Sequence, residues 1–173
     1  MKLSIITITF NAADTIEDAV QSVLSQRQDG FELEYLVIDG ASKDATLEIL
    51  APYRDRLTLI SEPDKGIYDA MNKGISLASG DYVGILNADD LYAADDVLMR
   101  VAALFKSSGA ESVYGDLVYV DRDDPTVVTR TWNSGAFNRK AFLHGWMPPH
   151  PTFFVRKSVY DAHGLFSLEL RSA

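Results

Sequence analysis

The first part of the chain alternates between short, nearly continuous apolar runs and longer stretches in which apolar residues recur every three or four positions. Continuous runs rich in β-branched residues, such as residues 2–10 (KLSIITITF), are typical of strands buried on both faces of a sheet. The spacing of Ile16, Val20 and Val23 is typical of an amphipathic helix. The predicted strands are residues 2–10, 34–38, 57–60 and 82–86, and the predicted helices are residues 16–24, 44–50, 67–78 and 97–105.

This alternation predicts an α/β fold with a mostly parallel central sheet flanked by helices. Strands separated by helices pair in parallel through right-handed crossovers, so we expect residues 1–105 to form a doubly wound, Rossmann-like sheet. The regular pattern ends after residue 105. Residues 112–120 and 126–132 predict two strands joined by a turn at 121–125, laid against the open side of the sheet. We interpret residues 1–173 as a single domain.

A cluster of polar side chains follows the strand predicted at residues 82–86. Asn87, Asp89 and Asp90 come directly after this apolar run. In an open α/β sheet the ligand crevice lies outside the carboxyl ends of the strands, where these side chains fall. Two adjacent carboxylates repel each other unless a hard divalent cation binds them, and such cations commonly share ligands with phosphates. The cluster therefore predicts a metal-diphosphate site; the alternative is a solvated helix cap, because a helical pattern begins near Asp95.

A second polar position follows the strand predicted at residues 34–38. Asp39 precedes Gly40, which allows a tight turn, and Phe10 ends the first predicted strand. A carboxylate at this edge can accept a hydrogen bond from a ribose or a nucleobase, and an aromatic ring can stack on the base. The alternatives are a turn-forming Asp-Gly pair and a core aromatic residue. The coincidence of both residues at neighbouring strand ends favours a nucleoside site.

Composition limits the classes of partner and the compartment. Of the 173 residues, 47% are hydrophobic, which fits a globular chain, and 25 acidic against 16 basic residues give a net charge of −9. This charge argues against a nucleic-acid partner, and no polybasic run is present to bind anionic lipid. The chain has no cysteine, no apolar run near the roughly 20 residues of a membrane helix and no leader pattern after Met1. We expect a soluble, cytoplasmic protein.

Several motifs occur in an order that resembles the family 2 glycosyltransferases, which adopt the GT-A fold. The resemblance is strong over residues 1 to about 100 and weaker over 149–170. Four motifs in the same order are far more specific than any single one. The motifs are residues 4–11 (SIITITFN), residues 39–46 (DGASKDAT), residues 62–74 (EPDKGIYDAMNKG), and, taken together as the fourth, residues 80–81 (GD) with residues 87–90 (NADD).

The resemblance implies a role for individual residues. Thr9, Phe10 and Asp39 would hold a uridine-type nucleoside, and Asp90, helped by Asp89, would bind a Mn or Mg ion. Asp69 and Asn72 lie one turn apart on the same helix and could both face the same crevice, or they could equally be plain surface residues. The full set of predicted nucleotide-binding residues is Thr9, Phe10, Asn11, Asp39, Ser42, Asp69, Asn72, Asn87, Ala88 and Asp89.

The resemblance also implies a reaction. Such enzymes transfer a sugar from a nucleotide-diphosphate donor, here a UDP-sugar, to an acceptor hydroxyl with inversion. The implied acceptor is a saccharide or a lipid-linked saccharide in cell-surface polysaccharide or glycolipid synthesis. For a lipid-linked acceptor we expect peripheral association with the inner face of the plasma membrane. In this interpretation residues 1–105 form the nucleotide-binding half, and residues 106–173 begin an acceptor-side half that is incomplete.

Two departures from the family pattern matter. Many members carry arginine where this chain has Met71, so a positive contact near the nucleotide is missing. Lys65 could replace that charge, or it could be a solvated loop lysine like Lys73. Residues 150–156 and 164–170 resemble the segment that precedes the general base, so we expect the base beyond Ala173. The alternative function is therefore a nucleotide-sugar-binding fragment that cannot turn over.

The remaining candidates are one histidine and two rival enzyme classes. His150 could titrate near neutral pH, bind metal or contact a phosphate, or it could simply pack on Trp146. A sugar nucleotidyltransferase would need a glycine-rich basic loop after the first strand, and a phosphatase would need an aspartate there. Residues 9–12 (TFNA) provide neither, which disfavours both classes.

Overall fold

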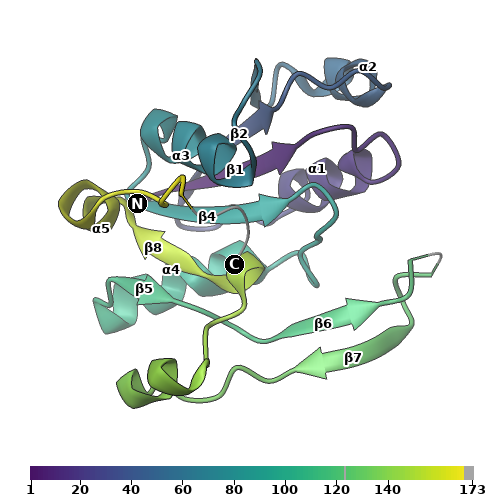
Figure 1. The fold of residues 1–173 in the computed structure, drawn as a ribbon. Helices are drawn as coiled ribbons and strands as arrows, with labels where there is room; N and C mark the ends of the chain where they lie inside the picture. The colour runs from purple at the N-terminus through teal and green to yellow at the C-terminus, as the bar shows by residue number, and fades with distance from the viewer. Residues whose placement is uncertain (123, 170–173) are drawn as a thin grey trace.

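The protein is built around a six-stranded sheet, seen in a computed structural model that describes residues 1–122 and 124–169 (Figure 1). Four neighbouring strands are parallel, and the predicted doubly wound arrangement is confirmed. The strand order is β3 (Thr58–Ser61), β2 (Glu32–Asp39), β1 (Lys2–Thr9), β4 (Tyr82–Asn87), β8 (Phe154–Arg156) and β5 (Ser112–Val113).

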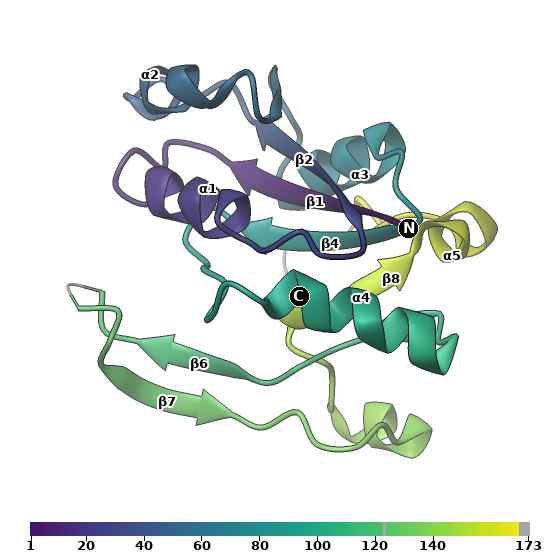
Figure 2. The ribbon, with the colours of Figure 1, turned by 180° about the vertical axis from the view of Figure 1, so that it is seen from behind.

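Helices cover both faces of the sheet. Helices α1 (Ile16–Leu24), α2 (Thr46–Leu50) and α4 (Val97–Ser108) pack on one face, which Figure 2 shows from its own side. Helices α3 (Ile67–Leu77) and α5 (Lys157–His163) lie on the other face. A short 3-10 helix, η1 (Ala51–Tyr53), extends α2.

The central strand β1 explains the continuous apolar run near the N-terminus. Leu3 and Ile5 face the core beneath α1 and α4, whereas Ile6 and Ile8 face the core beneath α3. Because successive side chains point to opposite faces, a strand covered on both sides needs apolar residues at nearly every position. Gly74 of α3 packs directly over Ile6, since a Cβ there would lie 2.4 Å from its side chain.

The part after α4 is less regular than predicted. Residues 112–120 were expected to form one strand, but this prediction was wrong, because they divide between β5 in the main sheet and β6 (Leu117–Val120) in a separate hairpin with β7 (Val128–Trp132). The division falls at Gly115 and Asp116, where Ser134 donates to the Gly115 carbonyl and to the Asp116 carboxylate. These contacts turn the chain out of the main sheet.

The strand of the sheet that comes last in the sequence, β8, pairs antiparallel with β4. It covers the open side of the parallel strands, as expected for the C-terminal part of the chain. Gly84 makes this pairing possible, because a Cβ there would lie 2.5 Å from the Phe154 ring. Two further 3-10 helices, η2 (Arg139–His144) and η3 (His150–Thr152), connect β7 to β8. A bilayer-spanning helix would have to be longer and more apolar than any found in the described ranges, 1–122 and 124–169.

A network of hydrogen bonds around Glu34 stabilises the end of the sheet at which the parallel strands begin. The Glu34 carboxylate accepts from Ser4 Oγ, from the Ser79 amide at 2.8 Å and from Ser79 Oγ, and it lies 3.3 Å from Lys2 Nζ. Partial burial raises the pKa of Glu34, but the hydrogen bonds from Ser4, Ser79 and Lys2 outweigh it and lower the pKa to about 2.

We predict that Glu34 makes stability depend on acid. Its folded pKa lies below its ordinary value, so its contribution is present above about pH 4.5 and is lost as the pH falls toward 2. Glu34→Gln should lower the free energy of unfolding at neutral pH by about 1–2 kcal/mol and flatten its pH dependence between these values. Urea denaturation across this pH range measures both effects. Glu32→Gln, on the same strand and paired only with Lys2, is the matched control, and an equal loss in both variants would contradict the assignment.

Candidate functional site

The predicted site residues converge at the carboxyl edge of the parallel strands. In the sheet register Thr9 of β1 lies beside Asp39 of β2, and Ile8 lies beside Asn87 of β4. The three strands therefore end side by side, as the arrowheads in Figure 1 show. The loops that follow them carry the other predicted residues, so most of the predicted set shares one edge of the molecule.

Asp39 is a fully buried carboxylate held by short polar contacts. It accepts from the Ser42 amide at 3.0 Å, from Ser42 Oγ and from Ser61 Oγ at 2.6 Å. A buried charge is tolerated only where donors of this kind satisfy it. Ser61 ends β3, and only the register of β2 with β3 brings it to Asp39, so the sequence did not point to it.

The loops after β1 and β2 are joined by hydrogen bonds. Asn11, in the left-handed region at φ 50°, donates its amide to Ser42 Oγ at 2.8 Å and accepts from the Lys43 amide at 2.8 Å. The Ala12 amide donates to Thr46 Oγ1 at 2.9 Å. Asn11 and Ser42 therefore act first as a scaffold that fixes the two loops together.

Two side chains beside this scaffold have a surface or a polar atom that the described residues leave unused. The Phe10 side chain is 60% exposed, which excludes the core role that was its alternative, and its ring lies next to Gly40. Thr9 Oγ1 is buried and makes no hydrogen bond within residues 1–122 and 124–169. An exposed ring and an unsatisfied hydroxyl therefore lie on either side of the end of β1.

In the acidic cluster, Asn87 and Asp90 are hydrogen-bonded to each other, and Asp89 and Asp90 are adjacent like charges. Asn87 Nδ2 donates to Asp90 Oδ2 at 2.8 Å, and the Asp90 amide donates to the Asn87 carbonyl at 3.1 Å. Burial and the neighbouring Asp89 charge raise the pKa of Asp90. Asn87 Oδ1 is buried and has no hydrogen-bond partner in the described part of the chain. Ala88 is buried, and Asp89 is exposed to solvent.

The helix-cap alternative for these acids does not describe the structure. Helix α4 begins at Val97, well beyond Asp90, and Asp96 precedes it without a side-chain capping bond. The oxygens of Asn87 and Asp90 are the ligand type that Mg²⁺ and Mn²⁺ prefer, and the unsatisfied Asn87 oxygen fits such an ion. No group of three acidic or histidine side chains able to hold a metal occurs among the described residues.

The loop that carries the acids is fixed by a residue that sequence reasoning missed. Gln26, which is buried beyond the end of α1, donates to the Ala94 carbonyl at 2.6 Å and accepts from the Leu98 amide at 3.0 Å. The Arg27 amide also donates to the Asp95 carbonyl at 2.7 Å. One signal was available, because Gln26 continues the three-residue spacing of the apolar face of α1 at a position where an apolar residue would be expected.

Asp69 and Asn72 of α3 are already engaged within the protein. The Asp69 carboxylate accepts from the Lys65 amide at 2.9 Å and lies 3.8 Å from Lys73 Nζ. The Asn72 amide donates to the Phe166 carbonyl at 2.9 Å, and its oxygen accepts from the Phe166 amide at 2.9 Å. Asn72 therefore ties α3 to the segment that follows α5.

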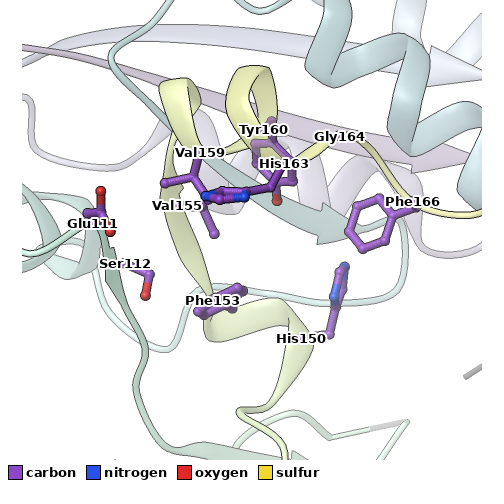
Figure 3. A pocket seen from close by; sticks show the side chains of 10 residues that line it. All are labelled: Glu111, Ser112, His150, Phe153, Val155, Val159, Tyr160, His163, Gly164 and Phe166. Carbon is purple, nitrogen blue, oxygen red and sulfur yellow. The ribbon is translucent and has the colours of Figure 1, made fainter.

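His150 lines a cavity of about 320 Å³ between β8, α5 and the segment that follows it (Figure 3). Its ring centroid lies 6.0 Å from that of Phe166, and its Nε2 is buried without a hydrogen-bond partner in the described ranges. Burial lowers the pKa of His150, which favours the neutral ring. The other lining residues are Glu111, Ser112, Phe153, Val155, Val159, Tyr160, His163, Gly164 and Phe166.

Comparison with solved structures identifies the fold. Residues 1–349 of Staphylococcus aureus TarS, solved with UDP, superpose with a TM-score of 0.74 at 21% identity, over 100% of this chain and 52% of that one. The mannosyltransferase PcManGT from Pyrobaculum calidifontis, solved with GDP-Man and Mn²⁺, gives a TM-score of 0.71 at 20% identity, over 97% of this chain and 48% of its own. The fold is that of the GT-A glycosyltransferases.

Comparison with curated sequences gives closer relatives. A PGL/p-HBAD biosynthesis glycosyltransferase of Mycobacterium tuberculosis is 35% identical over 97% of this chain and 64% of its own length. The Bacillus subtilis protein TuaG, whose name refers to teichuronic acid biosynthesis, is 34% identical over 65% of this chain and 46% of its own. The chain thus spans less than two thirds of the length of these relatives.

The sequence profile described as Glycosyl transferase family 2 matches residues 4–164, which is nearly the whole chain. This match agrees with the ordered motifs, the strand-end carboxylates and the GT-A fold. The chain belongs to glycosyl transferase family 2.

Proposed function

We propose that this chain binds a UDP-sugar and a divalent cation and contributes to the transfer of the sugar, with inversion, to an acceptor hydroxyl. The observation that carries the proposal is that Asp39 and Asp90 follow β2 and β4, the two strands that flank β1, at the same edge of the sheet in a family 2 chain. The relatives named for PGL/p-HBAD and teichuronic acid biosynthesis support a role in cell-surface glycan synthesis.

The nucleoside would bind at the ends of β1 and β2. Phe10 offers an exposed face on which a uracil ring can stack, and Thr9 Oγ1 offers a hydroxyl that needs a partner. Asp39 would accept a hydrogen bond from the base or the ribose, as its Ser42 and Ser61 contacts fix its position. The UDP bound by the structural neighbour TarS supports the choice of nucleotide.

The diphosphate would bind at the end of β4. Asp90, with Asp89 and the amide oxygen of Asn87, would hold a Mn or Mg ion, which when bound offsets the charge that grows on the departing diphosphate. These few protein ligands would suffice because such ions keep waters and share phosphate oxygens. Burial of Asp90 beside Asp89 supports the assignment, since a cation relieves the cost of ionising both acids.

We assign residues 1–105 to donor binding and residues 106–173 to the start of the acceptor side, where His150 faces the cavity. A lipid-linked acceptor would be met at the inner face of the plasma membrane.

A thermal-shift screen of sugar nucleotides with Mn²⁺ tests the function. We expect UDP-sugars to raise the melting temperature by several degrees at a hundredfold excess over Kd, because ligand binding then adds about 2.7 kcal/mol of stability. The shift should need both nucleotide and cation. Binding should occur whether or not the chain catalyses transfer, and absence of a shift with every sugar nucleotide would disprove the proposal.

Asp90→Asn should weaken Mn²⁺-dependent UDP binding at least tenfold while the protein stays folded. The pKa of Asp90 is raised in the folded protein, so keeping this carboxyl ionised at neutral pH costs folding free energy. Asparagine carries no charge and avoids this cost, so the variant should melt at an equal or higher temperature. For the same reason, cation affinity of the natural protein should rise with pH through the pKa of Asp90. Isothermal titration measures the affinity. Asp95→Asn, in the same loop, is the control, and unchanged titration of Asp90→Asn would contradict the assignment.

Phe10→Ala should weaken UDP binding roughly tenfold, because stacking of a base on an aromatic ring is worth about 1–3 kcal/mol. The loss should be the same factor with Mn²⁺ as with Mg²⁺, since the ring is assigned to the base and not to the diphosphate. Phe137→Ala removes an equally exposed ring beyond β7 and should leave UDP binding unchanged. Equal affinities of the natural protein and Phe10→Ala would reject stacking at this ring.

A further inference from the structure

Residues 137–147, which follow β7 and which we call the aromatic segment, expose a group of large apolar side chains. The segment lies at one end of the molecule beyond the main sheet, away from α1, α2 and α3, as the yellow-green turns in Figures 1 and 2 show. Contiguous exposed apolar groups of this kind usually mark an interaction site. The side chains with their exposed fractions are Leu143 (84%), Phe137 (64%), Met147 (55%) and Phe142 (47%).

The aromatic segment is ordered by its own contacts. The Phe142 and Trp146 rings meet edge to face with centroids 5.1 Å apart, and Phe137 approaches both rings at 6.2 and 6.3 Å. Trp146 Nε1 donates to the Ser134 carbonyl at 3.0 Å. The exposed rings are therefore presented by a fixed framework, which lowers the entropy cost of binding through them.

The stretch of sequence that contains this segment is basic, whereas the chain as a whole is acidic. The chain carries 25 acidic residues, yet residues 125–160 contain none. Arg139 and Lys140 lie within the aromatic segment itself, and neither is paired with an acid in the part of the chain that the structure describes. The basic residues of the acid-free stretch are Arg130, Arg139, Lys140, Arg156 and Lys157.

We propose that the aromatic segment docks the protein on the surface of an anionic phospholipid bilayer. Exposed leucine and phenylalanine side chains would enter the boundary between headgroups and acyl chains, while Trp146 has the amphipathic ring that favours this depth. Arg139 and Lys140 would face the lipid phosphates, each contributing through the surface potential. A net charge of −9 would otherwise repel such a surface, so the complementarity is local and is supplied by Arg139 and Lys140.

A second copy of the chain is the rival occupant of this face. Two copies would bring Arg139 and Lys140 of each chain toward the same basic neighbourhood, which like-charge repulsion disfavours. An anionic bilayer meets the apolar and the basic requirements together. The aromatic segment includes none of the residues assigned to the sugar nucleotide, so vesicle binding should not require a nucleotide.

Co-sedimentation with phosphatidylcholine vesicles, with and without phosphatidylglycerol, tests the proposal on the full chain. We expect binding to the anionic vesicles, weaker binding to phosphatidylcholine alone, and weakening by sodium chloride because salt screens the basic contacts. Phe137→Ser/Leu143→Ser should reduce vesicle binding at least tenfold. Leu77→Ser/Leu104→Ser, at exposed positions of α3 and α4, is the matched control and should bind as the natural protein does.

The charge and the depth of contact are tested separately. Lys140→Glu should reduce binding to anionic vesicles roughly tenfold, whereas Arg54→Glu, an exposed change elsewhere, should have little effect. In a Trp132→Phe background, brominated lipids should quench the fluorescence of Trp146. Melting temperatures confirm that each variant is folded.

Three results would overturn the proposal. The first is equal vesicle binding by Phe137→Ser/Leu143→Ser and its control, and the second is no binding of the natural protein to anionic vesicles at low salt. The third is that the natural protein is a dimer that does not bind vesicles, whereas this double variant is a monomer. The last result, measured by light scattering, would assign the face to contact between copies of the chain.

Discussion

The parallel register of β2, β1 and β4 is the constraint on which the rest of the structure depends. It aligns Thr9 with Asp39 and places Asn87 one strand away, so three loops leave the sheet at one edge. Burial on both faces fixes this register, because a slip of one residue would exchange the side chains of β1 between its two cores. Hydrophobic packing thus determines where the polar side chains stand.

The polar groups at this edge divide into a satisfied and an unsatisfied set. Asp39, Asn11 and Ser42 complete one another's hydrogen bonds and hold two loops rigid. Thr9 Oγ1 and Asn87 Oδ1, in contrast, lack partners among the described residues. Buried polar atoms of that kind cost free energy, which a bound ligand can recover. Such a division is expected of a preorganised site.

The features that could be predicted from the sequence are those that depend on local pattern. The strands and helices up to α4 follow from apolar periodicity, and Asp39 and the Asn87–Asp90 cluster follow from their positions after strands. The contacts of Ser61 and Gln26 could not be predicted in this way, because they depend on strand and loop pairs distant in sequence. The separation of β5 from β6 likewise depends on Ser134, which lies some twenty positions downstream of β5.

The hydrogen bonds between Asn72 and Phe166 have a mechanical consequence. They join α3 to a segment 94 residues later, and the Phe166 ring also stacks on Tyr68 at 5.6 Å. A movement of the segment after α5 must therefore break two hydrogen bonds or carry α3 with it. Because α3 starts just after the loop that Asp69 holds through the Lys65 amide, a movement of the segment after α5 would be passed to that loop along the same face of the sheet.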